Sequence, residues 1–290
     1  MIDYKKFVEN SRKWLEDYIT SNHLQSLVIG VSGGIDSTVT CAIASPVCHD
    51  LGIPLIGRSL PTTTNMPEEN NAAILVGMAF CSDFKVENIS EECQKLIYEL
   101  ELKEGNMTRL QEGNIKARVR MTYLYHLASI HRGCVLDTDN KTEHELGFWT
   151  IHGDVGDLNC GLIHLWKTEV YELAGYLYSE RLKFPDKNKL NALLKSAELM
   201  PTDGNGVMAG GDCAQFGLDN YEQVDDVLKF IYHRENNMEE SIHPLYENDE
   251  YIRLIDSYNE QGVDKVITLH QNTMFKRMHL PVYPELNNLV

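Results

Sequence analysis

A turn rich in glycine and serine is the segment of this chain best suited to chemistry. It runs from Ser32 through Gly33, Gly34 and Asp36 to Ser37, directly after an apolar stretch. Glycine has no Cβ, so the backbone at this turn can take positive φ and bring its amides close to an anion. The serines add hydroxyl donors, and the carboxylate can hold Mg²⁺ bound to phosphate oxygens. The turn therefore predicts a phosphate site, with an ordinary glycine-rich connection as the alternative.

Two elements must position this turn. Residues 27–31 are short, apolar and rich in β-branched side chains, which predicts a strand buried on both faces of a parallel sheet. Residues 38–44 predict a helix, whose free amides and positive dipole end would face the same anion. No lysine follows the glycines, so this is not a Walker A loop.

The rest of the chain alternates between helical and strand patterns. This order predicts an α/β fold with a parallel twisted sheet and helices on both faces, similar to a Rossmann fold. Ligands bind such sheets at the carboxyl ends of the strands, so the Ser32 turn and the segment Thr138-Asp139-Asn140 should share one edge. The expected helices are 4–20, 67–79 and 114–130, and the further strands are 51–56, 84–89 and 134–136.

Carboxylates gather after the last of these strands. Their density at one sheet edge predicts a Mg²⁺ site, although an acidic run can also be a solvated loop. They are Asp137, Asp139, Glu143, Glu145 and Asp154.

Composition limits the class of protein. The 290 residues are 43% hydrophobic and show no linker or repeat, so we expect a single domain over 1–290. Twenty-six basic against 43 acidic residues give a net charge of −17, which disfavours nucleic acid and a tRNA substrate. The seven cysteines lack metal-ligand spacing and fit reduced thiols. With no signal-peptide pattern or membrane-length apolar run, we expect a cytoplasmic protein that does not bind membranes.

Several motifs resemble a known family. Ser-Gly-Gly-Ile-Asp-Ser is similar to the signature of the N-type ATP pyrophosphatases, of the adenine nucleotide alpha-hydrolase superfamily. Residues 113–121, Gly-Asn-Ile-Lys-Ala-Arg-Val-Arg-Met, resemble a helix start characteristic of NAD synthetases, as do residues 138–154 in their spacing. Residues 165–170 and Lys276-Arg277 extend the match, which covers roughly residues 4–281.

The resemblance implies ATP-dependent amidation of deamido-NAD by ammonia. The nicotinate carboxylate would be adenylated with loss of pyrophosphate, and ammonia would then displace AMP. The resemblance also implies the ammonia-dependent type with no nitrilase-like glutaminase domain within 1–290. We expect a homodimer, because in this family deamido-NAD sits at the subunit interface.

Roles for individual residues follow from the same resemblance. Lys167 and Asp154 would be catalytic, the latter by orienting ammonium and accepting its proton. Asp36 and Glu143 would hold Mg²⁺. The residues expected to contact deamido-NAD are Asn114, Arg118, Asp154 and Lys276. Those expected to contact ATP are Gly30, Ser32, Gly33, Gly34, Asp36, Ser37, Arg58, Thr138 and Lys167.

The sequence departs from the family pattern beside the acyl substrate. Ile151 replaces the usual lysine, with His152 next to it, and Asp137 stands where glycine is usual. The alternatives are therefore a ligase of the same superfamily that adenylates another carboxylate, a tRNA-modifying pyrophosphatase, and a non-catalytic nucleotide-binding regulator. Retention of Asp36, Glu143 and Lys167 together argues against the regulator.

Overall fold

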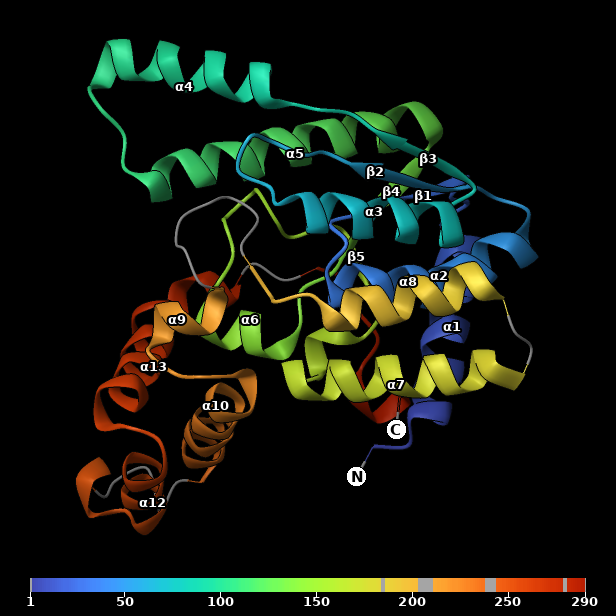
Figure 1. Cartoon of the computed structure of the whole chain (residues 1–290). Coiled ribbons are helices and arrows are strands. Elements are labelled where there is room, and N and C mark those ends of the chain that lie inside the picture. Colours follow the sequence, from blue (N-terminus) through green and yellow to red (C-terminus); the bar gives the residue numbers. More distant parts are fainter. Residues whose placement is uncertain (1, 184–185, 203–210, 238–243, 279–280, 290) are drawn as a thin grey trace.

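One parallel sheet of five strands lies at the centre of the fold, in the order β3-β2-β1-β4-β5 (Figure 1). The computed structural model describes residues 2–183, 186–202, 211–237, 244–278 and 281–289. The strands are β1 (Ser26–Gly30), β2 (Leu55–Ser59), β3 (Asp83–Val86), β4 (Gly133–Asp137) and β5 (Leu158–Asn159).

Helices surround the sheet and form most of the carboxyl-terminal part. None of those in the described residues is long and apolar enough to cross a membrane. The α-helices are α1 (Tyr4–Ser21), α2 (Ile35–Leu51), α3 (Pro67–Phe80), α4 (Ser90–Glu104), α5 (Arg109–His131), α6 (Lys141–Leu146), α7 (Lys167–Lys183), α8 (Lys187–Glu198), α9 (Asp212–Phe216), α10 (Tyr221–Asn236), α12 (Asp249–Ser257) and α13 (Glu260–Asn272); the 3₁₀ helices are η1 (Leu162–His164), η2 (Leu245–Glu247), η3 (Met274–Met278) and η4 (Leu286–Asn288).

Both faces of the sheet are buried, as the apolar run in β1 predicts. Leu27 and Ile29 pack into a cluster with α1, α2, α3, α7 and α8. Val28, between them, points to the opposite face and packs with α4 and α5. Figure 1 shows α5 on one side of the sheet and α2, α7 and α8 on the other. This alternation follows from the two-residue period of a strand and confirms the predicted parallel α/β fold.

A second apolar cluster lies beside the sheet, where α6, α9, α10, α12 and α13 meet. Leu146 of α6 belongs to this cluster, together with Val224 and Leu228 of α10 and Val263 of α13. The helices α9 to α13 form the orange and red group in Figure 1. The helix α6 therefore has one end at the sheet edge and one apolar side in this carboxyl-terminal group.

The predicted bounds of the strand 51–56 are wrong. The helix α2 runs through Leu51, and β2 begins only at Leu55. Gly52 ends the helix with φ +66°, and its N–H donates to the carbonyls of Cys48 and His49. The apolar run therefore spans a helix end and a strand start, which an apolar pattern alone does not separate.

The helix α2 also continues past Pro46, beyond its predicted end at residue 44. A proline inside a helix leaves the carbonyl four residues earlier without its usual donor. Here that carbonyl belongs to Ala42, and the guanidinium of Arg12 donates to it at 3.2 Å. A side chain from α1 thus replaces the missing backbone hydrogen bond.

The other predicted elements agree with the structure except at their ends. The helix predicted at 114–130 begins earlier, at Arg109, where Thr108 and Gln111 form a capping box. The strand predicted at 84–89 ends at Val86, and the helix α4 that follows was not predicted. Only Cys93 of α4 is buried, although Cys93, Ile97 and Leu100 recur at helical spacing.

Candidate active site

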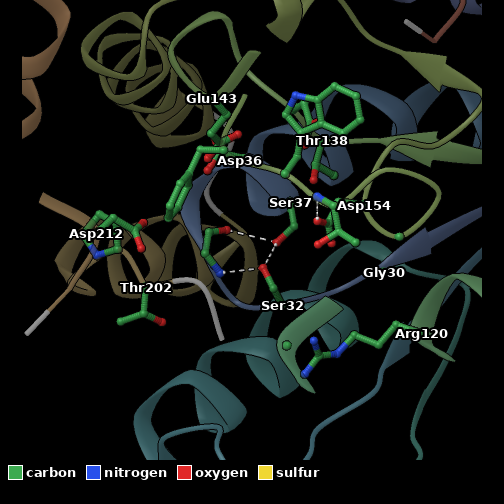
Figure 2. A pocket seen from close by; sticks show the side chains of 18 of the residues that line it. Gly30, Ser32, Asp36, Ser37, Arg120, Thr138, Glu143, Asp154, Thr202 and Asp212 are labelled. Carbon is green, nitrogen blue, oxygen red and sulfur yellow. Dashed lines mark hydrogen bonds between the residues drawn. The ribbon is translucent and has the colours of Figure 1, made fainter. Parts of the chain in front are cut away.

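The Ser32 turn lies between β1 and α2, at the point where the strand order reverses. The neighbouring strands β1 and β4 are consecutive in the sheet but not in the chain, which is the usual ligand position in open α/β sheets. Thr138 and Asp139 follow β4 at the same edge. The predicted meeting of the two segments is therefore confirmed, and Figure 2 shows Ser32, Ser37 and Thr138 around one pocket.

Glycine is required at one position of this turn. Gly33 has φ +88°, and a Cβ added there would lie 2.6 Å from the backbone nitrogen of Ala73 in α3. The backbone N–H of Gly34 donates to Ser32 Oγ at 3.2 Å, and the hydroxyls of Ser32 and Ser37 lie 3.1 Å apart. Gly34 is the N-cap of α2, with no side-chain cap. The turn thus directs hydroxyls and helix-start amides to one place, as an anion site needs.

A buried lysine joins two carboxylates beside the turn. Lys167 Nζ donates to Asp36 Oδ2 at 2.5 Å and to Glu143 Oε1 at 3.1 Å. The Nδ2 of Asn140 donates to the other carboxylate oxygen of Asp36 at 2.8 Å. The three ionisable groups come from α2, α6 and α7, so the fold brings together residues 131 positions apart. The sequence-predicted trio of Asp36, Glu143 and Lys167 meets at one point.

A capping box fixes Glu143 in this cluster. Asn140 is the N-cap of α6, and its side chain accepts from the N–H of Glu143 at 3.0 Å. In return, Glu143 Oε2 accepts from the N–H of Asn140 at 3.2 Å. One carboxylate oxygen is therefore used in the cap, and the other faces Lys167.

Burial and charge set the protonation of these groups. Burial raises the pKa of Glu143 to about 7, although the ammonium of Lys167 acts in the opposite direction. Burial also opposes the charge on Lys167, but the carboxylates of Asp36 and Glu143 outweigh it and hold its pKa above the usual value. The two carboxylates therefore favour the charged form of Lys167 between them.

The donor set fits Mg²⁺ bound together with a phosphate. Carboxylate oxygens of Asp36 and Glu143 flank one nitrogen position at 2.5 and 3.1 Å, so both can turn to a shared cation. Within the described ranges, no three acidic, cysteine or histidine side chains gather as a metal site. Magnesium commonly uses only one or two carboxylates and takes its other ligands from phosphates and water. These residues therefore suit a metal that arrives with a nucleotide.

The carboxylate of Asp137 has a structural role at the sheet edge and is not exposed to solvent. It is buried, and its carboxylate accepts from Asn159 Nδ2 at 2.6 Å and from Gly156 N at 2.9 Å. Burial raises the pKa of Asp137 to about 6. The aspartate at a position where the family usually has glycine thus ties β4 to the segment before β5. The carboxylate of Glu145 lies elsewhere, against Arg277 and His270.

Asp154 and Asn114 line the same pocket, and Figure 2 shows Asp154 near Ser37 and Thr138. Asp154 Oδ2 accepts from Thr150 N at 2.5 Å, and Thr150 Oγ1 donates to Asn114 Oδ1 at 2.8 Å. Burial raises the pKa of Asp154. Lys276 also lines this pocket, and its Nζ donates to the carbonyl oxygens of Gly147 and Trp149.

Two predicted contact residues are engaged by protein groups. Arg58 is buried, and its guanidinium donates to both carboxylate oxygens of Asp83. Arg118 is exposed, and its Nε donates to the carbonyl of Ile151 at 3.2 Å. The predicted contacts of Arg58 with ATP and of Arg118 with deamido-NAD stay predictions.

One cavity of about 870 Å³ is lined by the Ser32 turn, Lys167, Asp154 and Asn114. Its lining includes Gly30 and residues that sequence reasoning did not assign: Glu69, Arg120, Thr202 and Asp212. Figure 2 shows the labelled side chains of Arg120, Thr202 and Asp212 around the same space. Position on the motif helix, two residues after Arg118, could have indicated Arg120. Most of the glycine-containing stretch 201–211 lies outside the described residues.

This fold and site define an α/β protein of the adenine nucleotide alpha-hydrolase type. The sequence model described as NAD synthase matches residues 7–279, and the chain belongs to that family. Membership makes it a ligase of NAD biosynthesis that binds ATP.

Relatives of two kinds match the sequence. The NH₃-dependent NAD⁺ synthetase of Finegoldia magna is 33% identical over 179 residues, which cover 61% of this chain and 70% of that protein. The glutamine-dependent NAD⁺ synthetase of Aquifex aeolicus is 28% identical over 275 residues. That match covers 94% of this chain but 44% of the relative.

Solved structures match over nearly the whole chain. The NMN synthetase from Francisella tularensis has a TM-score of 0.73 at 22% identity, covering 99% of this chain and 100% of that one. The NH₃-dependent NAD synthetase from Campylobacter jejuni has a TM-score of 0.65 at 21% identity, with 98% and 100% covered. At these identities, the likeness shows the fold.

Proposed function

We propose that this chain amidates the nicotinate carboxylate of deamido-NAD with ammonia, converting ATP to AMP and pyrophosphate. The observation that carries the proposal is the convergence of Lys167, Asp36 and Glu143 beside the Ser32 turn, in a cavity that also reaches Asp154. Phosphate groups would lie by the Ser32 turn and Lys167, and the nicotinate carboxylate would lie by Asp154.

The first step activates the carboxylate. One of its oxygens attacks the α phosphorus of ATP, the bond from that phosphorus to the bridging oxygen breaks, and pyrophosphate leaves. Ser32, Ser37 and the amides of the turn would hold the leaving phosphates, while Lys167 balances their growing negative charge. Bound Mg²⁺, held by Asp36 and Glu143, would supply further positive charge to the same oxygens.

The second step forms the amide. Ammonia attacks the acyl carbon, the carbon–oxygen bond to AMP breaks, and AMP leaves. Ammonium must lose a proton before its nitrogen can attack, and the carboxylate of Asp154 would accept that proton. The raised pKa of Asp154 makes it a better base than an ordinary aspartate. Asn114, Arg118 and Lys276 would bind the dinucleotide beside Asp154, and Thr138 and Arg58 would contact ATP.

A second candidate substrate is nicotinate mononucleotide, the acid form of NMN. Two observations support this candidate. Ile151 stands where the family pattern has a lysine beside the substrate, and the NMN synthetase structure matches 99% of this chain. The chemistry would be the same, and the acid would lack the adenylate half.

The deciding experiment gives the chain ATP, Mg²⁺ and ammonium with either acid and follows AMP and the amide product. We expect AMP with deamido-NAD. If AMP forms only with the mononucleotide or another acid, the ligase class stands and the dinucleotide assignment is wrong. Glutamine in place of ammonium tests the nitrogen donor, and we expect no amide from it.

A further inference from the structure

One buried carboxylate from the carboxyl-terminal helices contacts both α6, which carries Glu143, and α7, which carries Lys167. Asp225 lies on α10 with 0% of its surface exposed. Its Oδ1 accepts from the hydroxyl of Thr142 at 2.5 Å, and its Oδ2 accepts from the N–H of Thr168 at 2.9 Å. Thr142 directly precedes Glu143, and Thr168 directly follows Lys167. Asp225 is thus hydrogen-bonded to the residue next to Glu143 and to the residue next to Lys167.

The hydroxyl of Thr142 extends this link to Lys167 itself. It accepts from the backbone N–H of Lys167 at 2.8 Å while donating to Asp225. The first N–H groups of a helix have no partner within the helix, and Lys167 and Thr168 begin α7. Asp225 and Thr142 together satisfy these two donors. A carboxylate at this position also interacts favourably with the helix dipole.

The neighbouring aspartate has a different partner. Asp226 accepts from the hydroxyl of Tyr258 at 2.6 Å, within the carboxyl-terminal helices. It therefore provides a control on the same helix: a carboxylate with the same chemistry, whose hydrogen bond stays within the carboxyl-terminal helices.

We propose that Asp225 is a positioning residue, which sets the separation of Glu143 and Lys167 by holding the starts of α6 and α7. The carboxyl-terminal helices would then contribute to the geometry of the ATP site without touching ATP. This inference rests on the proposed function, because it takes Glu143 and Lys167 as ligands of Mg²⁺ and phosphate.

The test replaces Asp225 with asparagine in the full chain. Asparagine has nearly the same shape but keeps only one acceptor oxygen, so it cannot accept from both Thr142 and Thr168. We expect calorimetry to show ATP binding in the presence of Mg²⁺ weakened by about 10- to 100-fold. The Mg²⁺ concentration for half-saturation should rise, whereas a general loss of fold would lower binding alike at every Mg²⁺ concentration. Asp226→Asn should bind like wild type.

Variants of Thr142 keep the test decisive if Asp225→Asn fails to fold. Thr142→Val removes the hydroxyl and should weaken Mg²⁺-dependent ATP binding, while Thr142→Ser keeps the hydroxyl and should restore it. If both act through one link, the double variant Asp225→Asn/Thr142→Val should bind about as weakly as the weaker single variant.

Two results would overturn the inference. One is Asp225→Asn or Thr142→Val with the Mg²⁺ dependence of wild type; the other is Thr142→Ser as defective as Thr142→Val. Because binding is measured without turnover, wild type that binds ATP and Mg²⁺ but amidates neither acid would contradict the proposed function alone. Wild type that does not bind ATP would contradict both.

Discussion

The ammonium of Lys167 is placed to balance charge that moves during the reaction. It lies between the carboxylates of Asp36 and Glu143. Lys167→Ala should therefore lower kcat/KM for AMP formation by about 10²- to 10³-fold, as loss of one preorganised charge donor does. Lys195→Ala, which removes a surface lysine paired with Glu198 on α8, should leave the rate unchanged. Coupled measurement of AMP checks both, and AMP formation at the wild-type rate by Lys167→Ala would contradict the phosphate-site model.

The protonation of Glu143 should affect stability in a window set by its raised pKa. The pKa changes from 4.5 to about 7 on folding, so between these values the folded chain keeps a proton that the unfolded chain has lost. The contribution of this group to stability therefore falls as pH rises through the window. Glutamine at position 143 cannot titrate. We therefore expect the free energy of unfolding of Glu143→Gln to rise by about 1–3 kcal/mol relative to that of wild type between pH 4.5 and pH 7.

Urea unfolding of both proteins at pH 5 and pH 7.5 measures this difference. The exposed Glu91→Gln on α4 gives the baseline for loss of a surface carboxylate. A difference between wild type and Glu143→Gln that stays constant with pH would show that Glu143 ionises normally in the folded chain.

At the level of elements, the turn between β1 and α2 depends on contact with α3. Gly33→Ala places a Cβ 2.6 Å from Ala73 N at φ +88°, so α3 or the turn must move. Gly52, at the other end of α2, has φ +66° but has nothing within 4 Å of an added Cβ. Gly52→Ala should cost about 1–2 kcal/mol of stability from its left-handed backbone alone and leave ATP binding intact. Gly33→Ala should cost more and also weaken ATP binding.

Calorimetry with ATP and Mg²⁺, together with urea unfolding, separates the two variants. Equal losses of stability with unchanged ATP affinity would mean that the approach of α3 does not shape the phosphate turn.

The sequence was most informative where structure is set by neighbours in the chain. The strand β1 and the glycine turn could be predicted because apolar period and Cβ-free residues act locally. The continuation of α2 past Pro46 could not, because it depends on Arg12, 30 residues before the carbonyl that it satisfies. The same holds in the site: family motifs identified Lys167, but its link to Asp225 joins α7 to another helix.

At the scale of the whole molecule, the expected homodimer stays a prediction, and exposed apolar side chains of α4 and α5 offer a surface for it. Leu102 near the end of α4 is 70% exposed, and Leu110 at the start of α5 is 60% exposed. Leu110 also lines the candidate cavity, so a second copy on this face would border the site. Figure 1 shows α4 as the outermost helix on this side of the sheet. We therefore predict that the dimer forms here and that the acid binds beside the interface.

A charge at this surface should separate the copies. Leu102→Glu places a carboxylate where apolar contact is expected, so sedimentation at micromolar concentration should show a shift from dimer toward monomer. The KM for the acid should rise with it, while binding of ATP with Mg²⁺ changes little, because the Ser32 turn lies within one copy. Tyr246→Glu, at an equally exposed apolar residue in η2, should leave the dimer intact. A monomer that retains full activity would contradict both the dimer and the placement of the acid at its interface.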